Sequence, residues 1–392
     1  MRLLLSAFVS VLLSANASAQ QENIDKSASP LEITTGVVFS DSVNPLISDD
    51  TDALGAALQV EGKLVTTQES SWFQLDYGAS YERFSLQDDQ LAFDDTQDFY
   101  GYNVRIMSRT FVSKSVTANL ELEHKTEQQK YGEGITRFQD NVLSVDTLRR
   151  NRAAASIVYG REPNRNTVVL DLFWQDDQYD DDNDYAPLFD LNQVGASVEG
   201  RYLLGGRVGL VARFSMSEDD YASETRVDST LYRALVGIEW QLTGSSNVRA
   251  LVGGFERDAD DNNDRDGFSY DLTYQYSPSE FSQFSINSKR TSAVSEVEFS
   301  SSSVDLIHSV DWQYELNERW FWGVNLNYLD KDIETIDVTR TIEQLDLFFR
   351  LGFNLNSYQL IRLDVMRRDV SSSDNSIDYQ QNEVGLRWQY VF

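Results

Sequence analysis

Charged side chains separated by a single residue are the most evident source of chemistry in this sequence. Glu121 and Glu123 form one such pair, and two neighbouring carboxylates can serve as a general acid and a general base. A serine hydrolase would also need a histidine oriented by a third group. The only two histidines, His124 and His308, alternate in phase with apolar residues and should point away from the charged side chains. We therefore expect no catalytic site and no enzyme.

The spacing of the charges indicates which elements carry them. From 345 to 355 every second residue is apolar, and the positions between include Asp346, Arg350 and Asn354. Successive side chains of a β-strand point to opposite faces, so this pattern predicts one apolar face and one charged face. A strand between lipid and a water-filled lumen has this alternation. The pattern therefore favours a transmembrane β-barrel.

The segment 383–392 shows the same alternation and finishes in aromatic side chains. Aromatic residues gather at the membrane interfaces of such barrels, and this strand resembles the signal by which outer-membrane barrels are recognised for insertion. The predicted membrane-insertion signal comprises Val384, Leu386, Trp388, Tyr390 and Phe392. We accordingly expect an integral multi-pass barrel of the cell outer membrane. Its expected partners are the membrane lipid and the barrel assembly machinery.

The beginning of the sequence predicts secretion across the inner membrane. Met1 and Arg2 give a short basic start, residues 3–13 are largely apolar, and 17–19 resemble a small-residue cleavage site. No later run of about 18 apolar residues follows, which excludes a helical membrane protein. The predicted segments are a signal peptide over 1–19, a periplasmic N-terminal tail over 20–30 and the outer-membrane β-barrel over 31–392.

Alternation along the whole chain predicts an all-β fold, a transmembrane antiparallel β-barrel of about 18 strands (roughly 16–18). The candidate strands are 31–40, 53–65, 71–85, 98–110, 115–126, 147–160, 166–176, 191–203, 207–217, 230–242, 247–256, 267–276, 281–290, 303–315, 319–329, 340–355, 358–368 and 379–392. The connections alternate between tight turns, such as 205–206, and longer segments rich in Asp, Asn and Ser, such as 176–190. This order predicts short periplasmic turns and long acidic extracellular loops.

The acidic residues are concentrated in the long connections. These hold nearly all of the formal net charge of −30, and a negative surface repels nucleic acid, so no nucleic-acid partner is expected. The carboxylates could simply be solvated, or they could bind Ca²⁺ or Mg²⁺ that bridges to lipopolysaccharide phosphates. Segment 258–264 lacks the glycine and glutamate of an EF-hand loop. We therefore expect no cofactor and no dedicated metal site, and at most loosely bound Ca²⁺ or Mg²⁺.

The polar faces of the strands would line the lumen, which is aqueous in a barrel of this size. Basic and acidic side chains are nearly balanced on these faces. The pore-lining candidates are Arg149, Arg150, Arg152, Arg201, Arg207, Arg213, Arg233, Glu61, Asp76, Glu121, Glu123, Glu199 and Glu239. They fit ion pairs that stiffen a solvated wall, or a ladder of both charge signs along which a hydrated polymer slides.

Two groups of residues are candidates for contact with a solute. Arg149, Arg150 and Arg152 form the densest basic cluster, so they would be the first contact of an anionic cargo. Trp72 and Phe173 could face inward and offer flat surfaces to sugar rings, or they could belong to a packed wall or an interface.

Two stretches of the sequence resemble a known family. Residues 33–43 include Gly36 followed by Asp41, Ser42 and Val43. They resemble the opening strand of outer-membrane β-barrel porins associated with exopolysaccharide export operons, although Ser42 stands where that family has asparagine. Residues 75–84 resemble the third strand of that family. The resemblance implies a barrel that lets a secreted polysaccharide cross the outer membrane, working with periplasmic polysaccharide-export proteins.

Three functions fit these observations. The leading hypothesis is an outer-membrane channel for export of a secreted polysaccharide, with the polysaccharide as its cargo. The alternative is an uptake porin for small polar solutes or oligosaccharides. A further alternative is a structural or adhesive surface barrel that works through its acidic loops. No sequence signature identifies a loop that constricts the lumen, so the cargo and the direction of transport stay open.

Overall fold

The computed structural model of the protein describes residues 31–43, 52–86, 96–131, 133–135, 144–160, 166–180, 183–260, 264–295, 302–334, 339–373 and 378–392. The predicted signal peptide and N-terminal tail lie outside these residues.

The described chain folds into successive β-strands and a short 3-10 helix, η2 (Ala186–Phe189). The strands are β1 (Glu32–Ser40), β2 (Ala53–Gln68), β3 (Ser71–Leu86), β4 (Thr96–Ser113), β5 (Val116–Gln128), β6 (Thr147–Tyr159), β7 (Thr167–Tyr179), β8 (Leu191–Gly205), β9 (Val208–Tyr221), β10 (Ser229–Thr243), β11 (Ser246–Ala259), β12 (Arg265–Ser279), β13 (Ser282–Val294), β14 (Ser302–Glu315), β15 (Trp320–Glu334), β16 (Thr339–Asn356), β17 (Gln359–Ser372) and β18 (Tyr379–Val391). Each candidate range predicted from the sequence coincides with one strand, with differences only at the ends.

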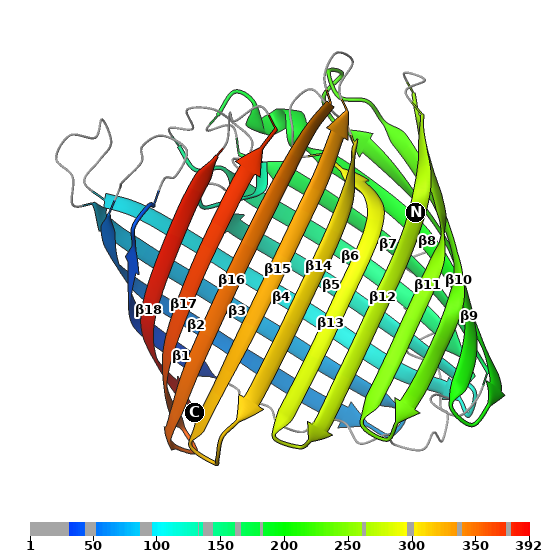
Figure 1. Ribbon diagram of the computed structural model, residues 1–392, viewed down its shortest axis with the longest axis horizontal. Helices are drawn as coiled ribbons and strands as arrows, with labels where there is room; N and C mark the ends of the chain where they lie inside the picture. The colour runs from blue at the N-terminus through cyan, green and yellow to red at the C-terminus, as the bar shows by residue number, and fades with distance from the viewer. Residues whose placement is uncertain are drawn as a thin grey trace.

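The strands form one closed antiparallel sheet. Each strand pairs with its neighbours along the chain, and β1 also pairs with β18, so the 18-stranded sheet closes on itself. In the closing pair Glu32 lies opposite Val391, and Ser40 lies opposite Glu383. Figure 1 shows the strands tilted around a common axis. The predicted fold class is confirmed, at the upper end of the predicted strand number.

The two faces of the sheet have opposite chemistry. Large apolar side chains at alternate positions are exposed on the outside; Leu54, Leu58 and Leu64 of β2 are examples. The residues between them, including Glu61 and Lys63, face the lumen. Exposed leucine is stable there because the surroundings of an outer-membrane barrel are lipid. The alternation that identified the strands thus also separates the membrane face from the channel face.

The two ends of the barrel differ in their connections. Short turns such as 206–207 and 244–245 join the strands at one end, and the long connections lie at the other end (Figure 1). Phe392 lies at the short-turn end, where its backbone N–H donates to Leu31 O at 2.9 Å. The predicted alternation of short turns and long loops is therefore present in the fold. The described residues contain no helix long and apolar enough to cross a membrane.

Strands β10 and β11 approach so closely that they require glycine on the lumen side. A Cβ placed on Gly253 would lie 1.9 Å from the carbonyl oxygen of Ala234. We expect Gly253→Ala to lower the free energy of unfolding by about 1–3 kcal/mol, because the added methyl group must push a paired strand aside. Urea unfolding of the protein refolded in lipid vesicles measures this loss. Gly200→Ala is the matched control, since nothing lies within 4 Å of its Cβ position; equal destabilisation by both variants would contradict the explanation.

Candidate functional site

Most of the predicted pore-lining residues lie on the lumen face of their strands. The strand registers place them in phase with one another and out of phase with the exposed apolar residues. The residues on this face are Glu61, Asp76, Glu121, Glu123, Arg150, Arg152, Glu199, Arg201, Arg213, Arg233 and Glu239. Trp72 and Phe173 also lie on it. These positions are compatible with pore lining, and their role in transport remains a prediction.

Two of the predicted residues are placed differently from the prediction. Arg149 lies opposite Gln178 on the lipid-facing side of the wall, where it forms a 2.6 Å ion pair with Asp180. Neighbouring residues of a strand point to opposite sides, so Arg149 and Arg150 cannot both line the lumen. Arg207 is exposed in the turn between β8 and β9. The prediction that all three arginines of the cluster line the lumen is therefore wrong for Arg149.

The predicted insertion-signal residues share the outer face of β18. Val384, Leu386, Trp388 and Phe392 are exposed there, and the Tyr390 ring meets the Phe392 ring edge to face. Their use as an assembly signal remains a prediction.

Both histidines lie on the outer face, as expected. His124 Nδ1 is 2.8 Å from Asn151 Oδ1, and the His308 ring stacks on Tyr328 with a centroid distance of 6.1 Å. Neither ring faces the charged side chains of the lumen. The geometry required for a lumenal serine–histidine site is therefore not assembled among the described residues.

Ion pairs hold many of the predicted lumen charges. Glu199 receives hydrogen bonds from Arg213 and Arg249, at 2.7 and 2.5 Å. Arg201 lies 3.1 Å from Glu239. These carboxylates hold the arginine head groups against side chains of neighbouring strands. The structure thus brings these predicted charges together as a paired lining.

Arg150 and Arg152 are also engaged by the wall. Arg150 binds Asp177 through two hydrogen bonds of 2.7 Å each. The Arg152 guanidinium lies 5.5 Å from the centroid of the Phe173 ring and donates to Gln175 at 3.3 Å. An anion could bind only the N–H groups of Arg150 and Arg152 that are not already engaged. The affinity of these arginines for an anion should therefore be lower than their number suggests.

A second charged network crosses the junction where the barrel closes. Arg387 of β18 reaches Glu82 of β3 at 3.6 Å, although β1 and β2 lie between them. Gly36 and Ala57 are their register neighbours on these two strands. A Cβ at Gly36 would be 2.8 Å from Arg387 Cγ. Because Gly36 and Ala57 are small, the long side chains of Arg387 and Glu82 can meet above them on the lumen face.

The connection between β5 and β6 returns into the lumen immediately after β5. Lys130 lies 2.5 Å from Glu82 and 4.0 Å from Glu383, side chains that belong to β3 and β18. Its ammonium also lies 5.6 Å and 5.9 Å from the ring centroids of Phe84 and Phe99. Burial disfavours its charged form, but the carboxylates of Glu383 and Glu82 outweigh burial and raise the pKa of Lys130. Lys130 therefore stays charged and anchors the connection to the lumen faces of β3 and β18.

The residue after Lys130 adds an apolar anchor. Tyr131 is 2 % exposed and packs against a cluster that includes Val38, Phe84 and Phe99. Burial and the Asp146 carboxylate raise the pKa of Tyr131 to about 12, so the phenol stays protonated at neutral pH. A charged contact and a hydrophobic contact thus hold the same short segment.

Glu133 forms a further contact between this connection and the lumen face of the barrel. Its carboxylate lies 3.4 Å from Arg368 of β17, which also donates to Asp346 at 2.9 Å. Strands β18, β1, β2, β3 and β4 separate β17 from β5, a path of roughly 29 Å along the wall at the usual strand spacing. The five residues from Gln128 to Glu133 span at most about 18 Å. Arg368 is in phase with Asp364 on the lumen face of β17, so the contact is made on the lumen side. The described residues of 129–135 thus bridge about a third of the ring of strands from the inside; we call them the crossing segment.

Other connections lock onto the crossing segment at the same end. Asp146 accepts hydrogen bonds from Asn183 at 2.6 Å and from Tyr185 at 2.9 Å. Ile135 of the crossing segment is buried against Ala186 and Phe189 of η2. The connections β5–β6 and β7–β8 are therefore packed into one body. This body was not predicted from the sequence, because its members come from polar connections without a strand period.

Arg226 ties two more connections to this body. Its guanidinium lies between the rings of Phe189 and Tyr221, 4.6 and 4.5 Å from their centroids. It also donates to Ser295 O, beyond β13, at 2.7 Å. A buried arginine in this arrangement joins the β7–β8, β9–β10 and β13–β14 connections. The described residues at the long-loop end therefore form a folded mouth that narrows the lumen.

The described residues contain no group of three or more metal-ligating side chains in suitable positions. The acidic segment 258–264 lies partly outside the described residues. Loosely bound Ca²⁺ or Mg²⁺ at the acidic loops, and contact with lipopolysaccharide, therefore remain predictions.

A closed barrel with an apolar outer face, a charged lumen and a folded mouth is an integral outer-membrane channel protein. The chain belongs to the family described as "putative beta-barrel porin 2", whose model matches residues 55–390. This membership confirms the predicted relationship to outer-membrane porins and the predicted location. The family description names no cargo, and no curated protein matches the sequence.

Solved structures with a similar barrel include several bacterial outer-membrane proteins. Pseudomonas aeruginosa OpdK with vanillate has 13 % identity, 92 % coverage of this chain, 98 % coverage of its own chain and a TM-score of 0.44. Pseudomonas aeruginosa OccK7 has 9 % identity, coverages of 94 % and 99 %, and a TM-score of 0.47. The siderophore receptor PirA from Acinetobacter baumannii has 8 % identity, coverages of 94 % and 81 %, and a TM-score of 0.46. These similarities do not bear on what the channel carries.

Proposed function

We propose that the protein is a passive outer-membrane channel for small polar solutes, taken up by diffusion. The observation that supports this most directly is the crossing segment, which lies inside the lumen and is tied by Lys130 to β3 and by Glu133 to β17. A folded segment across the lumen leaves room for water and small hydrated molecules beside it. A continuous hydrated polymer would require that segment to move aside for as long as the polymer passes.

The wall supports the same proposal. Its charges are paired across strands, as in Glu199 with Arg213 and Arg249, so the lumen presents both signs without a strong excess of either. Charged rings select by sign only when one sign dominates. The proposed solutes are therefore polar and neutral or weakly charged. Among the described residues we find no arrangement that supports catalysis, and passive diffusion of a solute requires no catalytic group.

Purified protein in planar lipid bilayers tests the proposal. We expect steady, ohmic conductance, together with liposome swelling that slows as the test sugars become larger. Absence of any open conductance would overturn the proposal. Export is tested separately in cells, where removal of the protein should leave the amount of surface polysaccharide unchanged. Loss of that polysaccharide would instead favour the export hypothesis drawn from the sequence.

A further inference from the structure

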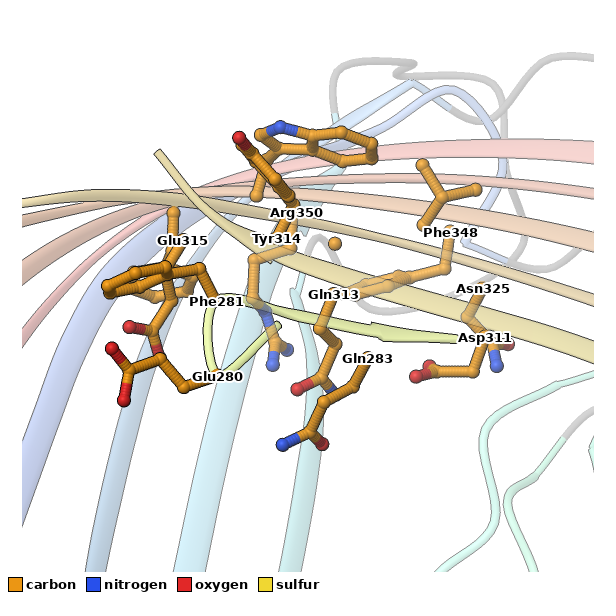
Figure 2. A pocket seen from close by; sticks show the side chains of 14 residues that line it. Glu280, Phe281, Gln283, Asp311, Gln313, Tyr314, Glu315, Asn325, Phe348 and Arg350 are labelled. Atoms are coloured by element: carbon orange, nitrogen blue, oxygen red, sulfur yellow. The ribbon is translucent and has the colours of Figure 1, made fainter. Parts of the chain in front are cut away.

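A hollow in the lumen wall near the short-turn end is separate from the crossing segment. It encloses about 190 Å³ between β13, β14, β15 and β16, and Figure 2 shows the side chains that line it. Pockets for drug-sized ligands have roughly 300–1,000 Å³, so this hollow suits a single small ring. Its place near the end of the lumen would put it on the path of any solute that has passed the mouth.

Aromatic side chains form the apolar part of the hollow. The half-buried Phe348 ring is held by the Arg350 guanidinium, 5.0 Å from its centroid, and Arg350 is held in turn by Asp364 at 2.9 Å. Phe321 packs over Gly352, where an added Cβ would lie 2.1 Å from the ring. The aromatic surface is therefore fixed in place before any solute arrives.

Polar side chains complete the lining. Gln283 and Gln313 are register partners on β13 and β14, and Asp311 and Asn325 are register partners on β14 and β15. Within the described chain no hydrogen bond or ion pair is found for the side chains of Gln283, Gln313 and Asp311, in contrast to the paired charges elsewhere in the wall. Asn325 accepts from Asn327 at 2.5 Å, which leaves its own amide N–H groups to donate.

This combination of groups defines the chemistry of a ligand. Amides donate and accept hydrogen bonds, and the Asp311 carboxylate only accepts them. Hydroxyl groups can satisfy both kinds of partner, whereas a carboxylate ligand would meet Asp311, Glu280 and Glu315 around the hollow. Arg350 offers little compensation, because Asp364 already neutralises it. An apolar face with several hydroxyl groups is the surface of a sugar ring.

We propose that this hollow is a saccharide subsite, in which one neutral sugar ring lies against Phe348 and its hydroxyl groups bind Asp311, Gln283 and Gln313. The proposal rests on the proposed function, because the sugar must enter the lumen to reach the subsite. It adds a solute class that the paired wall alone does not specify.

Sugar-induced current block in planar bilayers tests the subsite. Maltotriose, added to the wild-type channel, should reduce the open current in a saturable manner. Phe348→Ala and Asp311→Asn should each raise the maltotriose concentration for half-maximal block about tenfold. A change of this size is expected from the loss of an aromatic contact or of a hydrogen bond to a charged group. Phe111→Ala is the matched control, since the half-buried Phe111 is in phase with the lumenal Arg105 on β4 but lies outside the hollow. Heat-modifiable mobility on gels verifies that each variant is folded.

The outcomes separate the subsite from the channel itself. Open conductance without saturable block by maltotriose, or equal weakening by Phe111→Ala and Phe348→Ala, would overturn the subsite and leave the channel intact. Block by benzoate but not by maltotriose would show that the hollow takes aromatic acids, and would also overturn the saccharide assignment. Absence of conductance in the wild-type protein would contradict the proposed function instead.

Discussion

Lys130→Glu is expected to convert the narrowed channel into a wide one. The substitution places a third carboxylate beside Glu82 and Glu383, where Lys130 now binds both. Loss of a partly buried ion pair costs on the order of 3 kcal/mol, and the new repulsion adds to that cost. Such a change is enough to move a two-state segment from mostly closed to mostly open. Single-channel recordings should therefore show higher conductance and faster entry of larger sugars.

The control for this variant makes the same change of charge at a lysine outside the crossing segment. Lys114→Glu alters an exposed lysine in the turn between β4 and β5, so its conductance should match that of the wild type. Alkaline pH gives a second readout, since the carboxylates of Glu383 and Glu82 hold the pKa of Lys130 above the ordinary lysine value. The contact contributes its full stability below the ordinary lysine pKa. That stability is lost as the pH rises through the higher pKa that Lys130 has in the folded protein. Conductance should stay constant up to the ordinary lysine pKa of about 10.4; a rise near neutral pH would contradict the anchor.

The barrel itself was predictable from the sequence because its cause is local. One side chain in two meets lipid, so apolar residues recur with a period of two wherever a strand crosses the membrane. The range 31–40 also proved to be a strand, although its alternation is weaker than that of 345–355. There Gly36 weakens the pattern, because the glycine serves the contact between Arg387 and Glu82 and not the membrane face.

The folded mouth was not predictable in the same way. Lys130, Glu133 and Arg226 lie in polar connections, where no period indicates their direction, and their partners are hundreds of residues away or on distant strands. A sequence shows that such residues are charged, but only the closed barrel brings Glu133 to Arg368. The mistaken placement of Arg149 has a different origin. There, composition was given more weight than alternation, although alternation already separates Arg149 from Arg150.

Arg257→Ala is expected to be among the most destabilising single substitutions in the wall. Arg257 is 3 % exposed and donates to Asp219, itself 1 % exposed, at 2.5 Å, and to Ser229 at 2.7 Å. Removing the guanidinium leaves a buried carboxylate without its counter-charge, which costs about 3–5 kcal/mol. Urea unfolding in lipid vesicles should show this loss as a lower midpoint with an unchanged slope.

A second substitution distinguishes loss of the ion pair from loss of packing. In the double variant Arg257→Met with Asp219→Leu, no charge is left buried, so most of the stability should return through a large favourable coupling between the two sites. Arg83→Ala provides the exposed comparison, since Arg83 pairs with Asp98 on the outer face with both side chains about half exposed, and such pairs contribute little. A double variant as unstable as Arg257→Ala would mean that shape at this position matters more than charge. Because the pair joins β9 to β11 across β10 close to the long-loop end, its loss should also loosen the strands that support Tyr221 and, through it, Arg226 in the folded mouth.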